Sequence, residues 1–226
     1  MSVHMQLDLS ILHKDLLTMC TQVEDMIHRA VAQLAEPDFD IARQLMQEDT
    51  EIDRKDVQIE DSCLKILALY QPVAIDLRRI TAVLKISGEL ERVADLAVNI
   101  AERACSLLNT PPVPVPDNLK GMAKRAVDML HRSIDAYVDL DSTAARKVCL
   151  EDDEIDELNL QLIQELIVQM HQSPEQLDAL LHLFSAVRQV ERVADHATNI
   201  AEDVVYLVEG RIIRHARKLE SKTPGS

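Results

Sequence analysis

Acidic residues spaced four positions apart are the side chains of this sequence most suited to chemistry. Glu91 and Asp95 form one such pair, and Glu191 and Asp195 form another, inside two twelve-residue segments that are identical at ten positions. Two acids four residues apart lie on one face of a helix, where their repulsion costs about 0.2–0.5 kcal/mol. An unfavourable pairing that recurs one hundred residues later indicates that both pairs bind something of opposite charge.

One further acidic pair occurs in the helical segment that precedes each of these repeats. All-carboxylate sets suit Mg²⁺, Ca²⁺, Mn²⁺ or oxygen-ligated iron, and carboxylates on helices packed about 8–10 Å apart can share a cation. An asparagine on the same face can add a carbonyl ligand or orient the carboxylates. The candidate metal ligands are therefore Asp49, Asp53, Glu91, Asp95, Asn99, Asp152, Asp156, Glu191, Asp195 and Asn199.

Two other interpretations of the acidic pairs stay open. The acids can form solvated helix faces that duplication has copied, so that a metal-free helical adaptor docks basic partners through acidic stripes. A di-metal carboxylate oxidoreductase is the second alternative, but it needs Glu-x-x-His on facing helices. Ala94 and Ala194 stand at the histidine positions. We therefore predict no enzyme, no catalytic residue and no organic cofactor site.

The net charge, the cysteine spacing and the lack of long apolar runs limit which partners and which compartment the sequence predicts. The chain has 226 residues and a net charge of −15, which argues against nucleic acid and against anionic membrane surfaces. Its four cysteines are widely spaced, as in proteins that keep reduced thiols. The N-terminus lacks an apolar signal region, and no apolar run approaches the roughly 18 residues of a membrane span. We expect a soluble, cytoplasmic protein without membrane insertion.

Apolar residues recur at intervals of three and four along most of the chain, which predicts amphipathic helices. The repeat predicts an all-α fold of two tandem, similar antiparallel three-helix bundles, with the acidic stripes outside the core. The expected domains are residues 1–109 and 117–218, joined by the proline-rich linker 110–116 and followed by a disordered tail, 219–226. The expected helices cover about 9–34, 38–70, 72–108, 119–138, 142–171 and 174–217, the last capped by Ser173.

These motifs resemble one known family. The two Glu-Arg-Val-Ala-Asp-x-Ala-x-Asn-Ile-Ala-Glu segments, the Asp-x-x-Ile-Asp pairs and the stretch Gln71-Pro-Val-Ala-Ile-Asp-Leu-Arg78 are similar to the PhoU family of phosphate-uptake regulators. The resemblance spans about residues 7–214. It implies a cytoplasmic, often dimeric protein that represses the phosphate-starvation regulon. Such proteins link the phosphate ABC transporter ATPase to a sensor histidine kinase.

The resemblance also implies metal clusters at the acidic pairs, with iron, zinc, magnesium or manganese as occupants and one ion or several at each cluster. One cluster would comprise Asp49, Asp53, Glu91 and Asp95, and the other Asp152, Asp156, Glu191 and Asp195. The second half lacks a counterpart to the stretch from Gln71 to Arg78. We interpret Asp76, Arg78 and Arg79 as a helix-start acid and helix-face ion pairs.

Overall fold

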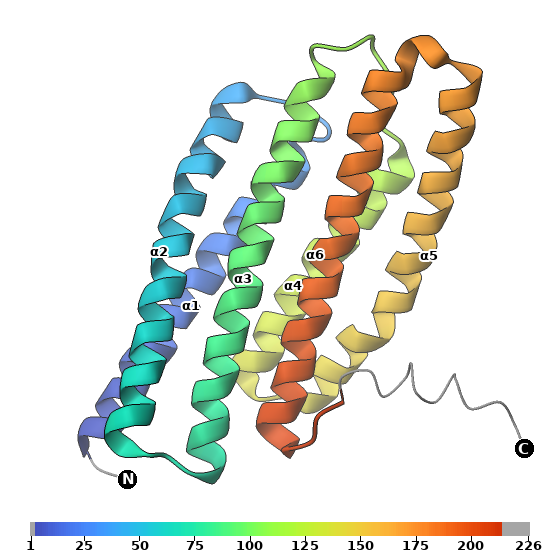
Figure 1. The fold of residues 1–226 in the computed structure, drawn as a ribbon. Helices are drawn as coiled ribbons and strands as arrows, with labels where there is room; N and C mark the ends of the chain where they lie inside the picture. The colour runs from blue at the N-terminus through green and yellow to red at the C-terminus, as the bar shows by residue number, and fades with distance from the viewer. Residues whose placement is uncertain (1–2, 214–226) are drawn as a thin grey trace, which may run out of the picture.

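The computed structural model describes residues 3–213, and these form six long α-helices with no strand. The first half contains α1 (Val3–Ala32), α2 (Phe39–Tyr70) and α3 (Ala74–Leu107). The second half contains α4 (Asp117–Asp139), α5 (Ser142–Gln172) and α6 (Leu177–Glu209), with the short 3₁₀ helix η1 (Pro174–Gln176) before α6. The predicted all-α fold of six helices in two three-helix bundles is confirmed (Figure 1).

Helix boundaries follow local capping chemistry. Asp38 and Asp141 are the N-caps of α2 and α5, and their side chains accept hydrogen bonds from first-turn amides. The sixth helix was predicted to reach residue 217, and this was wrong. It ends at Glu209 because Gly210 adopts a left-handed conformation (φ 72°) and donates its N–H to the Tyr206 carbonyl at 2.9 Å.

The start of the sixth helix also differs from the prediction. Ser173 makes no side-chain capping hydrogen bond, and Pro174 begins the 3₁₀ turn η1 instead of α6. The α-helix follows at Leu177. The predicted tail, residues 219–226, lies outside the described part of the chain, as do the last residues expected for this helix.

The six helices form two layers. Figure 1 shows α2, α3, α6 and α5 side by side in that order, with α1 and α4 behind them. The two central helices, α3 and α6, make the most extensive contact of any helix pair. Alanines on both of them, including Ala97, Ala101, Ala197 and Ala201, are fully buried, which lets the backbones approach closely. The buried apolar side chains of both halves form one continuous core.

This arrangement places the acidic repeats. The two repeated segments lie on the central helices α3 and α6, and the preceding acidic pairs lie on the outer helices α2 and α5. Each cluster therefore spans the groove between an outer and a central helix. None of the helices within residues 3–213 contains a stretch with the length and apolar character of a membrane span.

Candidate metal centre

The first acidic cluster lies between α2 and α3. Asp49 and Glu91 are half-buried, whereas Asp53 and Asp95 are exposed. Burial, followed by the charges of Asp95, Asp53 and Glu91, raises the pKa of Asp49 to about 6. Burial and the neighbouring acids Asp95, Asp56 and Asp53 also raise the pKa of Glu91. The four predicted ligands thus share one electrostatic environment, although they come from two helices.

The second cluster, between α5 and α6, is more tightly assembled. One carboxylate oxygen from each of Asp156, Glu191 and Asp195 lies within 4.8 Å of the other two. Burial and then the charges of Glu191, Asp152 and Asp156 raise the pKa of Asp195 to about 6. Asp152 takes part through its charge, and its Oδ1 accepts a hydrogen bond from the Thr198 hydroxyl at 3.1 Å. Sequence reasoning placed the acids outside the core, but Glu191 is only 9% exposed.

Two oxygens in these clusters are buried and have no hydrogen-bond partner among the described residues. They are Asp49 Oδ1 in the first cluster and Glu191 Oε2 in the second. Burying an unpaired carboxylate oxygen costs about 1–3 kcal/mol or more. A cation held by several carboxylates in each cluster would satisfy the orphaned oxygen there. Hard oxygen donors of this kind suit magnesium, manganese or iron. The residues present therefore fit a metal ion at each cluster.

The side-chain N–H groups of the two predicted asparagine ligands donate to acceptors other than the cluster carboxylates. Asn99 donates its side-chain N–H to the Asp95 carbonyl of its own helix at 2.8 Å. Asn199 donates instead to Glu89 Oε2 on α3, at 3.1 Å. Asn99 therefore stabilises α3 itself, whereas Asn199 links α6 to α3.

In each half, an arginine on the first helix forms ion pairs next to the acidic cluster. Arg29 on α1 binds Glu48 of α2 and Asp25 of its own helix. Arg132 on α4 repeats this arrangement with Glu151 of α5 and Asp128. Because Glu48 and Glu151 directly precede Asp49 and Asp152, these ion pairs fix the outer helices where the cluster acids begin.

Both halves of the chain match the same known domain family. The PhoU domain matches this chain twice, at residues 16–104 and 119–204. The chain belongs to the PhoU family. The two matched segments cover the two bundles, so the internal repeat is a repeat of this domain. Each carries one of the acidic clusters.

Individual PhoU proteins are similar over almost the whole chain. The phosphate-specific transport system accessory protein PhoU homolog of Aquifex aeolicus is 36% identical over 202 residues, which is 89% of this chain and 91% of the relative. The crystal structure of PhoU from Pseudomonas aeruginosa has a TM-score of 0.88 at 32% identity, covering 91% of this chain and 99% of that one. The phosphate transport system regulatory protein PhoU from Streptococcus pneumoniae has a TM-score of 0.84 at 26% identity, covering 92% and 98%.

The structure adds residues to this PhoU site that sequence reasoning missed. Asp56 lies close enough to raise the pKa of Glu91, after burial and Asp95, and its repeat equivalent is the buried Asn159. Arg188 donates to Glu191 Oε1 at 3.0 Å, whereas its repeat equivalent is Gly88. Aligning the two halves residue by residue would have shown both differences. Their positions beside the clusters, however, depend on how the helices face one another.

A buried polar pair joins the two central helices beside the second cluster. His196 shares a hydrogen bond of 2.6 Å between its Nδ1 and Glu89 Oε2 on α3, and both side chains are buried. Burial opposes ionisation of Glu89, but the hydrogen bonds from His196 and Asn199 hold its pKa below the ordinary value. His196 directly follows Asp195, so this contact fixes the part of α6 that presents the acid.

The stretch from Gln71 to Arg79 serves mainly as a structural junction. Arg79 lies 3.8 Å from Asp76, the helix-face ion pair that the sequence suggested. Arg78 differs from that expectation, because its Nε donates to the Leu207 carbonyl near the end of α6 at 3.3 Å. Its guanidinium also lies against Gly210. The stretch therefore ties the start of α3 to the end of α6.

Proposed function

We propose that this protein is a non-enzymatic regulator of phosphate uptake that represses the phosphate-starvation regulon and holds metal ions at two carboxylate clusters. The regulatory role is supported by membership of the PhoU family and by relatives named as phosphate transport accessory or regulatory proteins. The metal sites are supported most directly by Asp156, Glu191 and Asp195. Their oxygens converge to within 4.8 Å, and Glu191 also has the orphaned oxygen Oε2.

The proposed ligands are the four acids of each cluster. Asp49, Asp53, Glu91 and Asp95 would hold the first cation or cations, and Asp152, Asp156, Glu191 and Asp195 the second. A bound divalent or trivalent ion, such as iron, zinc, manganese or magnesium, would supply positive charge that cancels the repulsion among these carboxylates. The residues would thereby hold an outer helix to a central helix in each half. The surface presented to partners would then depend on metal supply.

The proposed partners are the phosphate ABC transporter ATPase and a sensor histidine kinase, with the protein acting between them as a homodimer in the cytoplasm. The relatives' names support an association with the transport system. Repression would require this protein to transmit the transporter's state to the kinase. The strongly acidic composition, with a net charge of −15, favours basic surfaces on these partners.

The metal proposal is tested by elemental mass spectrometry of untagged protein purified without chelator. We expect more than one metal ion per chain. Neutralising one cluster should remove only the metal of that cluster and leave the helix content unchanged. The first variant is Asp49→Asn, Asp53→Asn, Glu91→Gln and Asp95→Asn; the second is Asp152→Asn, Asp156→Asn, Glu191→Gln and Asp195→Asn.

A matched control separates the clusters from general acidity. Asp153 and Glu157 form an exposed acidic pair four residues apart on α5, one position along from the ligands Asp152 and Asp156. Asp153→Asn with Glu157→Gln should retain all the metal. Absence of metal in the wild-type protein after incubation with each cation at neutral pH would contradict the metal sites.

The regulatory proposal is tested in the source organism through phosphatase expression at high phosphate. Deletion of the gene should raise expression, and the wild-type gene should restore repression. The two cluster variants should restore it less well than the control pair. Unchanged expression after deletion would contradict the regulator, whereas full repression by metal-free variants would favour the metal-free adaptor.

A further inference from the structure

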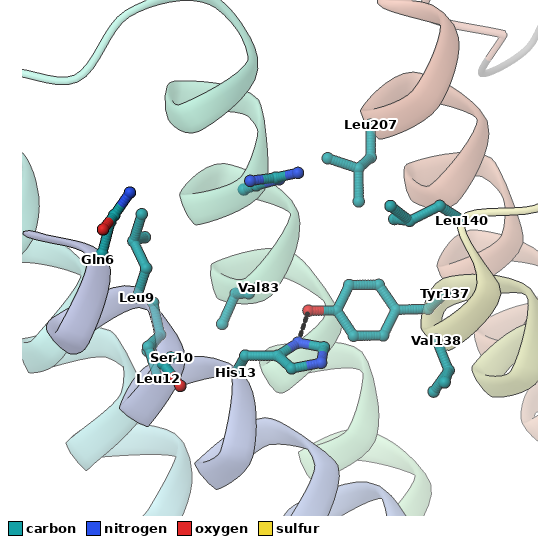
Figure 2. A pocket seen from close by; sticks show the side chains of 11 residues that line it. Gln6, Leu9, Ser10, Leu12, His13, Val83, Tyr137, Val138, Leu140 and Leu207 are labelled. Carbon is teal, nitrogen blue, oxygen red and sulfur yellow. Dashed lines mark hydrogen bonds between the residues drawn. The ribbon is translucent and has the colours of Figure 1, made fainter. Parts of the chain in front are cut away.

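A cavity of about 440 Å³ lies where α1 of the first half meets α3, α4 and α6. Small-molecule sites generally have volumes of about 300–1,000 Å³, mostly apolar walls and a few converging polar groups. The walls here include Leu9, Leu12, Val83, Leu140 and Leu207. Figure 2 shows Leu9 on one side of the space and Leu140 and Leu207 on the other.

The polar side chains that line the cavity belong to Gln6, Ser10, His13, Tyr137 and Arg79, and Arg79 is the cation among them. Tyr137 and His13 meet across the cavity, with 3.0 Å between the phenol oxygen and His13 Nδ1 (Figure 2). Burial, followed by the nearby thiols Cys20 and Cys63, raises the pKa of Tyr137, so the phenol stays protonated and donates this bond. Because Nδ1 accepts this bond, the ring N–H lies on Nε2, where it can donate to a ligand.

The charge of the cavity is opposite to that of the protein. The described residues that line it include Arg79 and no acid, in a chain with 39 acidic and 24 basic residues. The Arg79 guanidinium is half-exposed, and its ion pair with Asp76 is long, at 3.8 Å. It can therefore turn towards an anion at the mouth of the cavity without losing a short ion pair.

We propose that this cavity binds a small apolar carboxylate, whose hydrocarbon part packs against the leucines and whose carboxylate binds Arg79. The apolar walls disfavour inorganic phosphate, because a fully hydrated anion would lose water there without enough replacement donors. The absence of acids among the described lining residues disfavours cations. A straight-chain acyl group and an aromatic acid share the required chemistry. Because the walls come from both halves, an occupant would hold α1 against α4 and α6.

Titration calorimetry with octanoate, 4-phenylbutyrate, 1-octanol and inorganic phosphate tests this site. We expect octanoate or 4-phenylbutyrate to bind, and their relative affinity identifies the straight-chain or aromatic class. Arg79→Gln should weaken carboxylate binding about tenfold, since hydrogen bonds to charged groups are stronger than neutral ones. The same variant should leave 1-octanol binding unchanged, and phosphate should not bind.

A second variant tests the location. Ser10 is an exposed lining residue of α1, so Ser10→Trp should fill the cavity without disturbing the core and should abolish binding of both octanoate and 1-octanol. Thr18→Trp, also exposed on α1 but away from the cavity, is the control and should bind normally. Circular dichroism confirms the fold of each variant. The proposal fails if neither carboxylate binds at millimolar concentration, if Arg79→Gln or Ser10→Trp has no effect, or if phosphate alone binds.

Discussion

The two acidic clusters have equivalent ligands but unequal surroundings. In the second cluster, three oxygens converge and Arg188 donates to one carboxylate. The first cluster has Gly88 at the arginine position, and it has the additional acid Asp56 where the second has Asn159. Duplication has therefore preserved four carboxylates in each half while changing the charge around them. The first cluster is the more negative, and the second is the more organised before any cation arrives.

This difference indicates a division of roles. Affinity for a hard cation rises with the number of charged ligands and with the rigidity of the site. The first cluster relies on charge, so its affinity should depend strongly on neighbouring acids and on pH. The second relies on organisation, and its frame includes the buried contact between Glu89 and His196. Leu96 and Gln189 occupy the equivalent positions in the other half, so only the second cluster has this polar support.

The largest expected effect comes from removing that support. His196→Leu installs the residue found at position 96 and leaves the buried Glu89 carboxylate without its 2.6 Å hydrogen bond to the imidazole. Glu89 keeps its hydrogen bond from Asn199, but losing the imidazole bond to a buried carboxylate should still lower the free energy of unfolding by about 2 kcal/mol. Chemical denaturation of the metal-free protein measures the loss.

A second substitution distinguishes lost hydrogen bonding from lost packing. Adding Glu89→Gln to His196→Leu reproduces the neutral glutamine and leucine of the other half. We expect the double variant to recover at least half of the lost stability, because no charge is left buried. If the double variant is no more stable than His196→Leu alone, the charge does not explain the cost, and the contact is mainly a packing contact.

An exchange of the positive charge between positions 188 and 88 should reverse part of the difference between the clusters. Arg188→Ala removes a positive charge that lies 3.0 Å from Glu191 Oε1, and we expect cation affinity at the second cluster to rise about tenfold. Gly88→Arg should lower affinity at the first cluster by a similar factor. Position 88 accepts a side chain without a clash at its first carbon, because a Cβ at Gly88 would meet no atom of a neighbouring element within 4 Å.

This exchange is measured by Mn²⁺ titration calorimetry in proteins whose other cluster has been neutralised. Arg192→Ala, an exposed position next to Glu191 in the sequence, controls for the general loss of positive charge. Changes in the same direction at both clusters, or an equal effect of Arg192→Ala, would show that local charge does not set the difference.

The sequence predicted the helices and the cluster acids because both depend on periodic patterns. Pairs such as Asp49 and Asp53 are set by one helix, and the repeat indicated which helices belong together. The sequence did not predict the burial of Glu191 or the hydrogen bond from Asn199 to Glu89, because both depend on how α6 faces α3. Gly210 differs from these, because a glycine at this point of the sequence is itself a signal for the end of a helix. Metal binding at the clusters stays a prediction.

The smallest expected effect concerns pH and tests whether the first cluster relies on charge. Folding raises the pKa of the Asp49 carboxyl from 3.8 to about 6, so the folded state favours the protonated form. Its contribution to stability is present below about pH 4 and is lost as the pH rises through about 6. In metal-free protein at pH 7, Asp49→Asn should therefore raise the free energy of unfolding by about 1 kcal/mol, a figure reduced for solvent screening. At pH 4 the variant and the wild type should be equal.

A saturating cation should reverse this order, because it stabilises the folded wild type through the carboxylate that Asp49→Asn removes. The cation's benefit should shrink between pH 7 and pH 5, as protons compete for the same oxygen.

Asp195→Asn tests the same argument in the second cluster, where the pKa of Asp195 is also raised to about 6. The side chain of Asp195 is exposed and screened by water, so the gain in stability should be smaller. Chemical denaturation with chelator and with Mn²⁺, using Asp153→Asn as control, measures both. If Asp49→Asn destabilises the metal-free protein at pH 7, repulsion does not dominate the first cluster, and the contrast between the two halves must rest on geometry alone.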